Sequence, residues 1–258
     1  MQAALIFRGA ARFSRIRETA WQALWRNKMN IYLLAHSGVA LETDDRVLVF
    51  DPWQDPARHL ETLARTEKPL YFFVTHAHGD HFAPRYGKEY GERAARFVLE
   101  KDCCDAAYPA AKTEYVSAGD TLTLDDMTIR VYGSTDAGAS YHVAWPELSV
   151  FHAGDLNWWH WTGDTDAANR DMRALFFREL APAVEHGADI VFFPVDDRQG
   201  PAQEWGVIEY LQKQTPSRLL VPIHRNGAPW EPSLYFFWRF ADVAVWTGLT
   251  DGDVRKGV

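Results

Sequence analysis

Three histidines and an aspartate lie within six consecutive positions, directly after an apolar run with the length of a buried strand. The run is Tyr71-Phe72-Phe73-Val74, and the segment after it reads Thr75-His76-Ala77-His78-Gly79-Asp80-His81. An extended backbone sends His76 and His78, which are two positions apart, to the same face. Gly79 permits a sharp turn, so Asp80 and His81 re-enter from a different direction. Nitrogen and oxygen donors this dense at a strand end predict a metal site that can hold more than one ion.

The composition predicts a folded globular protein with one large domain. The chain has 258 residues, of which 47% are hydrophobic and 14% aromatic. That length supports a sizeable core, and that apolar content argues against disorder. The formal net charge of −8 discourages a nucleic-acid footprint over the whole surface, so no nucleic-acid partner is expected.

Cysteine usage and hydropathy bear on the compartment. The two cysteines, Cys103 and Cys104, are adjacent, and a disulfide between neighbours is strained. Such scarcity suits a reducing compartment and predicts a cytoplasmic protein. No apolar run approaches the length needed to cross a bilayer, so no stable membrane anchor is expected. The sequence carries no indication of the oligomeric state.

Residues 1–28 differ in composition from the rest of the chain. Six basic residues accompany a single acid, Glu18, and apolar side chains recur at roughly helical spacing. Three interpretations stay open: a helix packed on the domain, a basic amphipathic segment for a membrane surface or for targeting, or an extension upstream of a start at Met29. We favour the helix or the extension, because the segment lacks the apolar core and cleavage pattern of a secretory signal. Residues 29–258 are predicted to form one domain.

The remaining pattern alternates between short apolar strands and amphipathic helices. Runs of strands, then helices alternating with strands, predict a layered α/β architecture. Helices are predicted over 59–65, within 84–93, over 167–186 and 205–212, and after Trp230. Strands are predicted over 31–35, 39–42, 46–50, 70–74, 95–99, 121–124, 128–132, 141–144, 149–152, 190–193 and 219–223.

Three further apolar strands end in a candidate ligand. They are Val150-Phe151-His152-Ala153-Gly154-Asp155, Val221-Pro222-Ile223-His224 and Val47-Leu48-Val49-Phe50-Asp51. With the histidine-rich loop, Ala153-Gly154-Asp155 and His224 in this order, the chain resembles the metallo-β-lactamase-fold hydrolase superfamily from Asn30 to about Asn226. The presence of His81 makes it more similar to the glyoxalase, lactonase and phosphodiesterase branches than to the true β-lactamases.

The resemblance implies a four-layer αββα sandwich, in which two mixed β-sheets lie face to face and helices flank them. It also implies two divalent metal ions in a cleft at one edge of the sandwich. Zinc fits histidine and carboxylate ligands best, and manganese or iron is possible. Carried over by position, the first ion is held by His76 and His78, the second by Asp80, His81 and His224, and Asp155 bridges them.

The implied function is hydrolysis of a small-molecule ester, lactone or phosphodiester by a metal-bound hydroxide, which two closely spaced ions make available at neutral pH. Asp80 could orient that hydroxide or move its proton while ligating. Two alternatives remain: a nuclease-type phosphodiesterase, and a non-catalytic metal-binding module with a degenerate first site. The absence of a dense basic patch counts against the nuclease.

One departure from the superfamily pattern concerns the first ion. The superfamily usually supplies a third histidine there, and Ser134 stands at that position in Tyr132-Gly133-Ser134-Thr135-Asp136. Asp136 could reach the same ion as a substitute carboxylate, or water could fill the position. We favour Asp136, because a site with two protein ligands and a bridge would bind zinc less tightly. His142 and His152 are rival candidates, which we interpret as structural or supporting residues.

Five more residues are candidates for supporting or substrate-contacting roles. Asp51 either orients the ligand histidines from behind or caps its own turn. His36 lies at the cleft rim or marks a bulge. Trp158 and His160 follow Asp155 closely and would wall the cleft or pack as core. Arg198 could bind an anionic substrate group or pair with a neighbouring aspartate.

Overall fold

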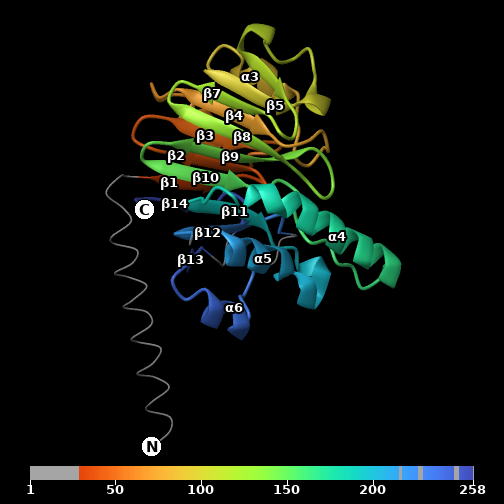
Figure 1. Ribbon diagram of the computed structural model, residues 1–258. Helices are drawn as coiled ribbons and strands as arrows, with labels where there is room; N and C mark the ends of the chain where they lie inside the picture. Colours follow the sequence, from red (N-terminus) through yellow and green to blue (C-terminus); the bar gives the residue numbers. More distant parts are fainter. Residues whose placement is uncertain (1–28, 215–216, 226–228, 247–249, 258) are drawn as a thin grey trace, which may run out of the picture.

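The computed structural model describes residues 29–214, 217–225, 229–246 and 250–257 (Figure 1). Residues 1–28 lie outside the described residues, so the interpretations of that segment stay predictions. None of the helices in the described ranges has the length and hydropathy that a bilayer crossing requires.

Two mixed sheets of seven strands each form the centre of the fold. The first has the order β14 (Val254–Arg255), β1 (Asn30–Leu33), β2 (Val39–Glu42), β3 (Val47–Phe50), β4 (Leu70–Val74), β5 (Arg96–Glu100) and β6 (Thr113–Val116). The second has the order β13 (Ala244–Val245), β12 (Leu219–Ile223), β11 (Ile190–Pro194), β10 (Leu148–His152), β9 (Ala139–Trp145), β8 (Met127–Gly133) and β7 (Thr121–Leu124).

Helices cover the outer faces of both sheets. Against the first sheet pack α2 (His59–Leu63) and α3 (Arg85–Tyr90), and against the second pack α4 (Asp166–Ala183), α5 (Trp205–Lys213) and α6 (Leu234–Arg239). Short 3-10 turns are η1 (Lys101–Cys103), η2 (Ala110–Lys112) and η3 (Asp197–Ala202). The predicted αββα class is therefore confirmed.

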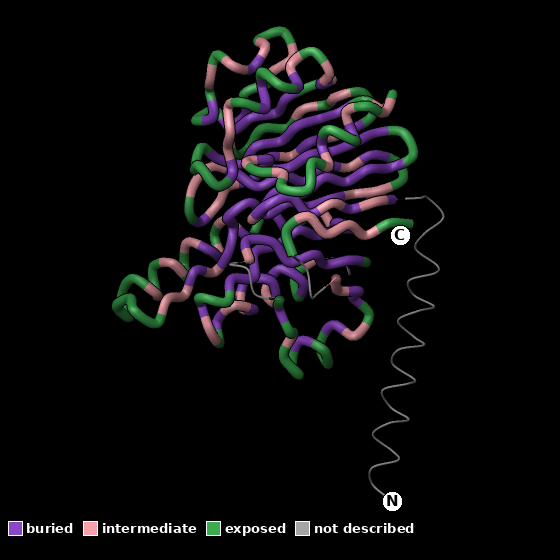
Figure 2. The backbone as a smooth tube through the Cα atoms, turned by 180° about the vertical axis from the view of Figure 1, so that it is seen from behind, coloured by how far each residue is buried: buried purple, intermediate pink, exposed green. Residues whose placement is uncertain are grey.

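Strand periodicity explains the layers. Successive side chains of a strand point to opposite faces. Phe73 accordingly packs between the sheets, while its neighbours Phe72 and Val74 pack under α2 and α3. In the second sheet Phe192 faces inward and Phe193 faces α5. Because both faces are covered, these strands read as continuous apolar runs, and Figure 2 shows them buried along their length.

Parallel pairing brings the polar strand ends together. Strands β3 to β6 run parallel to one another in the first sheet, and β10 to β13 do so in the second. The carboxyl ends of parallel strands meet at one edge of a sheet, where open α/β sheets bind their ligands. Asp51, His76, Asp155 and His224 all follow strands of these two sets directly or within three residues.

Three strands that the sequence pattern missed, β6, β13 and β14, all lie at sheet edges. An edge strand is half covered, so its side chains need no apolar pattern; Glu114 and Tyr115 of β6 are exposed. The predicted helix over 167–186 ends earlier, at Ala183, directly after Pro182. Pro182 weakens this last turn, because proline lacks the backbone N–H donor.

Candidate metal centre

A first group of donors comes from three loops at the carboxyl ends of the strands. His76 and His78 follow β4, Asp136 lies in the β8–β9 turn and Asp155 follows β10, and their ligand atoms all lie within 4.8 Å of one another. Nε2 of His76 is 3.5 Å from Oδ2 of Asp155, and Nδ1 of His78 is 3.5 Å from Oδ2 of Asp136. A tetrahedral ion with bonds of about 2.1 Å separates its ligand atoms by about 3.4 Å. The four side chains therefore match one cation.

A glycine brings the β8–β9 turn against the histidine-rich loop. Gly138 has a φ of +65°, and a Cβ there would lie 2.0 Å from the carbonyl oxygen of Thr75 and 2.5 Å from Cβ of His76. The backbone N–H of Ala139 donates to that same carbonyl at 2.9 Å. Only glycine combines this φ with this approach, and the contact carries Asp136, two residues earlier, to the first group.

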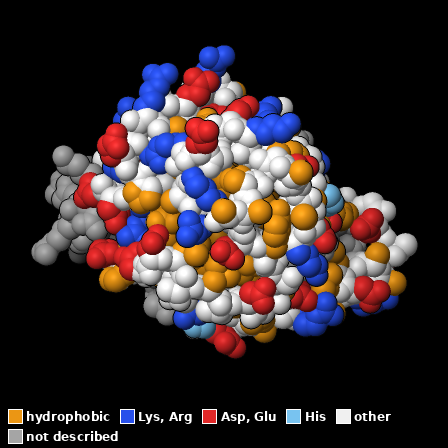
Figure 3. Space-filling model, turned by 90° about the horizontal axis from the view of Figure 1, so that it is seen from above, with side chains coloured by type: hydrophobic (Ala, Val, Ile, Leu, Met, Phe, Trp, Pro, Cys, Tyr) orange, Lys and Arg blue, Asp and Glu red, His pale blue; other side chains and the backbone are white. Residues whose placement is uncertain are grey.

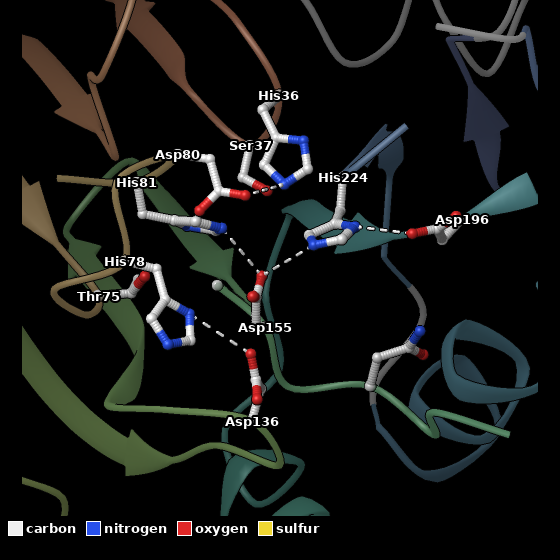
Figure 4. Close-up of polar contacts among 12 residues, drawn as sticks. His36, Ser37, Thr75, His78, Asp80, His81, Asp136, Asp155, Asp196 and His224 are labelled. Atoms are coloured by element: carbon white, nitrogen blue, oxygen red, sulfur yellow. Dashed lines mark hydrogen bonds and ion pairs between the residues drawn. The ribbon is translucent and has the colours of Figure 1, made fainter. Parts of the chain in front are cut away.

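A second group consists of His36, His81 and His224, whose ligand atoms also lie within 4.8 Å of one another (Figure 4). Asp155 stands between the two groups and is 3% exposed. Its Oδ1 lies 3.2 Å from Nε2 of His81 and 3.7 Å from Nε2 of His224, whereas its Oδ2 faces His76. One carboxylate therefore presents an oxygen to each group.

Asp51 orients the histidines of the loop through Thr75. Its carboxylate accepts hydrogen bonds from Nδ1 of His81 at 2.9 Å, from the Thr75 hydroxyl at 2.8 Å and from the Thr75 backbone N–H at 2.8 Å. Because the Thr75 hydroxyl donates its hydrogen to Asp51, it accepts from Nδ1 of His76, 3.0 Å away. Both imidazoles thus carry their proton on Nδ1 and turn an Nε2 lone pair to the centre.

Asp196 does the same for His224. It follows β11, is fully buried, and its Oδ2 lies 3.1 Å from Nδ1 of His224. It also pairs with the Arg198 guanidinium. The sequence suggested Asp196 and its neighbour Asp197 only as alternative partners for Arg198. Asp196 follows a buried strand, as Asp51 and Asp155 do, and this position could have indicated its contact with His224.

Several buried lone pairs at the centre have no hydrogen-bond partner. They are Nε2 of His36, His76 and His81 and Oδ1 of Asp155. Buried polar atoms without partners are costly and uncommon in folded proteins. A cluster of such atoms around one point is what divalent cations bind, so the donor set fits the metal that the resemblance implies.

The pKa values of Asp155, His81 and His76 are shifted by burial and by the neighbouring donors. Burial acts to raise the pKa of Asp155, but His81, His224 and His76 outweigh it and hold that pKa well below its usual range. Burial acts to lower the pKa of His81, but Asp155 and Asp51 raise it to about 10. The pKa of His76 is lowered, mainly by burial. A proton on His81 occupies the place that a cation would take, so metal binding competes with protons.

Comparisons with known proteins find relatives that are named metal-dependent hydrolases. No family model matches the chain. It is 27% identical over 216 residues to a UPF0173 metal-dependent hydrolase from Pyrobaculum arsenaticum, covering 78% of this chain and 86% of that protein. A UPF0173 metal-dependent hydrolase of an Exiguobacterium species is 25% identical over 219 residues, covering 78% and 88%.

Solved structures share the fold at low sequence identity. Igni18, a metallo hydrolase from Ignicoccus hospitalis, has a TM-score of 0.61 at 15% identity and covers 89% of this chain and 98% of its own. The metallo-β-lactamase fold protein YhfI from Bacillus subtilis has a TM-score of 0.55 at 14% identity, covering 90% and 100%. The chain has the metallo-β-lactamase fold. The predicted resemblance to this superfamily is thus confirmed, and the predicted metal-dependent hydrolase agrees with the names of the sequence relatives.

The two donor groups differ from the ligand set that the resemblance implies. Ser134 belongs to neither group, and Asp136 lies in the first group instead. Asp80 also lies outside both groups: its side chain is 51% exposed, and its Oδ2 is 3.6 Å from Nε2 of His36. His36 takes a place in the second group that the sequence analysis did not assign to it.

A pocket of about 240 Å³ adjoins the first group. Trp159 and Trp161 stack with ring planes 5° apart and form part of its wall. Trp158 and His160 do not line it, since both rings contact Trp205 at the start of α5. The residues that line the pocket are Thr135, Asp136, Asp155, Trp159, Trp161, Met172, Arg198 and His224.

The two rival histidines have structural contacts. His152 stacks on Phe50 with ring planes 5° apart, accepts the Gly154 backbone N–H and lies 3.0 Å from the Ser37 carbonyl oxygen. Nε2 of His142 lies 3.0 Å from the carbonyl oxygen of Gly187. Neither belongs to either donor group.

Proposed function

We propose that this protein is a hydrolase that uses two divalent ions to attack an ester, lactone or phosphodiester bond in a small molecule. The observation that carries the proposal is Asp155, a buried carboxylate with one oxygen toward each of two donor groups. A carboxylate can span two ions, whereas an imidazole lone pair serves one. The names of the sequence relatives support metal-dependent hydrolysis.

Named residues would hold the ions. His76, His78 and Asp136 would hold the first, and His81 and His224 would contribute to the second. Asp155, which has one oxygen toward each group, would serve both. Zinc suits these donors best, with manganese or iron as alternatives. Two divalent ions supply Lewis acidity and make hydroxide available from water at neutral pH.

The protein side chains then position the substrate and move the proton. Asp80 is the exposed carboxylate beside the second group and is suited to accept a proton from the attacking water. Trp159 and Trp161 form an apolar part of the pocket wall and are suited to contact apolar groups of the substrate. Arg198, at the same pocket, is suited to contact an anionic group of the substrate.

The size of the pocket and the mixed charge of the molecular surface favour a small substrate over a nucleic acid. A volume of about 240 Å³ is small even for a pocket that takes one drug-sized ligand. On the face seen in Figure 3, lysine and arginine side chains are interspersed with aspartate and glutamate. A nuclease would need a continuous positive surface for the phosphate backbone.

Metal analysis combined with a substrate panel tests the proposal. Protein purified without added metal should contain about two equivalents of divalent metal per chain and hydrolyse at least one lactone, ester or phosphodiester. The variant Asp136→Ala should retain about one equivalent, since the first ion loses a ligand. Asp171→Ala, an exposed carboxylate on α4, is the matched control and should retain both. Metal-replete protein without hydrolytic activity would favour the non-catalytic alternative, and an unchanged count in Asp136→Ala would rule out its role as a ligand.

A further inference from the structure

We infer that the hydroxyl of Thr135 positions Asp136 as a ligand of the first ion. The inference rests on the proposed two-ion centre and concerns how one ligand of that centre is held. Thr135 lies in the β8–β9 turn, directly before Asp136, and is 5% exposed. It belongs to neither donor group, so its role is that of a positioning residue.

The carboxylate of Asp136 is oriented differently from the histidines around it. Three of those histidines are held through Nδ1 by a neighbouring side chain, namely Thr75, Asp51 or Asp196. The side chain of Asp136 is 52% exposed, and its Oδ2 lies 3.5 Å from Nδ1 of His78. Among the residues that the structure describes, none donates a hydrogen bond to this carboxylate. Its direction must therefore come from the backbone of the β8–β9 turn.

The Thr135 hydroxyl attaches that turn to the loop that carries Asp155. Its oxygen accepts the backbone N–H of Asn157 at 2.9 Å. Its hydrogen points to two carbonyl oxygens, that of Asn157 at 2.7 Å and that of Asp155 at 3.1 Å. Asp136 and Asp155 both belong to the first donor group. The attachment therefore sets the separation of the two carboxylates in that group.

The loop that receives these hydrogen bonds is held by a second buried contact. Nδ2 of Asn157 donates to Oε1 of Gln199 in η3 at 3.0 Å, and Nε2 of Gln199 donates to the Trp158 carbonyl oxygen at 2.9 Å. Both amide side chains are buried. A Cβ at Gly206 would lie 1.9 Å from Oδ1 of Asn157, so glycine lets α5 begin directly against this amide. Thr135 is thus bonded to a segment that is itself fixed.

The turn is held on both sides of Asp136. After it, Gly138 packs against the Thr75 carbonyl oxygen, which accepts the backbone N–H of Ala139 at 2.9 Å. Before it, Thr135 is bonded to the loop after β10. Asp136 therefore lies between the two loops that supply the rest of the first group. A side chain whose backbone is already fixed loses less conformational entropy when it binds an ion.

Removal of the Thr135 hydroxyl from the full chain tests the inference. Thr135→Val keeps the shape of the side chain but leaves buried carbonyl oxygens and an N–H without their partner. We expect the first ion to bind roughly 10–100-fold more weakly and the second ion to keep its affinity. Thr135→Ser retains the hydroxyl and should restore the wild-type affinity, and Thr135→Ala serves if Thr135→Val folds poorly. Competition with a chromophoric chelator measures both affinities, and circular dichroism measures folding.

A double-mutant cycle with Asp136→Ala separates positioning from a general loss of stability. The ion lost in Asp136→Ala identifies the first site. If Thr135 acts through Asp136, Thr135→Val in the Asp136→Ala background should not weaken the remaining ion. Thr43→Val is the matched control, because its hydroxyl accepts the Arg46 N–H at 3.2 Å and donates to Asp45 at 2.8 Å in the β2–β3 turn. This variant should keep both metal affinities.

Three results would overturn the inference. They are an unchanged affinity for the first ion in folded Thr135→Val, an equal weakening of both ions, and a further loss of affinity in the double variant. Asp136→Ala protein that keeps both ions would also overturn it, by removing the ligand that Thr135 is inferred to position. Failure of the two-ion proposal itself would appear earlier, as wild-type protein without two equivalents.

Discussion

At the level of single side chains, two carboxylates outside both donor groups contact histidines of the centre. Asp51 and Asp196 each contact Nδ1 of one histidine and leave the Nε2 lone pair facing the centre. Such partners fix the tautomer and raise the basicity of the imidazole. They also make the histidines rigid before any ion arrives, which lowers the entropic cost of binding.

Replacement of Asp196 tests this support. Asp196→Asn keeps the size of the side chain but removes the negative charge that stabilises His224 as a ligand. We expect the second ion to bind roughly 10–100-fold more weakly, measured by competition with a chromophoric chelator. Asp197→Asn is the matched control, because this neighbouring carboxylate is exposed. Equal affinities in the two variants would contradict the supporting role.

At the level of secondary-structure elements, Glu42 on β2 links three segments of the first sheet. Its carboxylate accepts hydrogen bonds from Asn30 at 2.7 Å and Tyr32 at 2.8 Å, both on β1, and from Lys68 at 2.8 Å, which precedes β4. Burial acts to raise the pKa of Glu42, but the bonds from Lys68, Asn30 and Tyr32 outweigh it and lower that pKa.

This pKa shift predicts a pH dependence of folding. A carboxyl group whose pKa is lowered in the folded state contributes its full stabilisation at pH values above its unfolded pKa of about 4.3. That stabilisation is lost as the pH falls through the folded value. Glu42→Gln should lower the free energy of unfolding by about 1–2 kcal/mol at pH 7, and the difference should shrink below about pH 4. Urea unfolding at several pH values measures this difference.

The control is Glu61→Gln, whose carboxylate forms an exposed pair with Arg58. It should change stability by less than about 0.5 kcal/mol. A pH-independent effect of Glu42→Gln would contradict the assignment.

At the level of the whole molecule, the centre joins the two halves of the sandwich. The histidine-rich loop follows the first sheet, whereas Asp155 and His224 follow strands of the second. Metal binding should therefore stabilise the packing of the two sheets in addition to the loops.

Removal of metal should lower the melting temperature. An ion at 100 times its dissociation constant contributes about 2.7 kcal/mol. For a protein of this size each kcal/mol corresponds to roughly 2–4 °C, so chelation should lower the midpoint by roughly 5–10 °C. Differential scanning calorimetry before and after dialysis against a chelator, with zinc added back as the control, measures the change. An unchanged midpoint in both samples would mean that no ion binds at this centre.

Local pattern predicted most of the architecture. Strands β2, β4 and β12 have the predicted bounds, because buried strands read as apolar runs between turns. The exposed edge strand β7 also has the predicted bounds. The histidine-rich loop, Asp155 and His224 were visible as polar residues at the ends of such strands. The edge strands β6, β13 and β14 were not predicted. Part of an edge strand faces solvent, so its residues need not form an apolar pattern.

The roles of particular donors depend on contacts between segments far apart in the chain. The residue types around the motif predicted a metal centre, because the side chain alone makes a histidine or an aspartate a potential metal ligand. Which of them lie close enough to share an ion depends on distances between loops: Gly138 allows Asp136 to reach the first group, and the turn at His36 brings a third imidazole to the second. Those distances arise when two sheets pack, and no spacing along the chain encodes them.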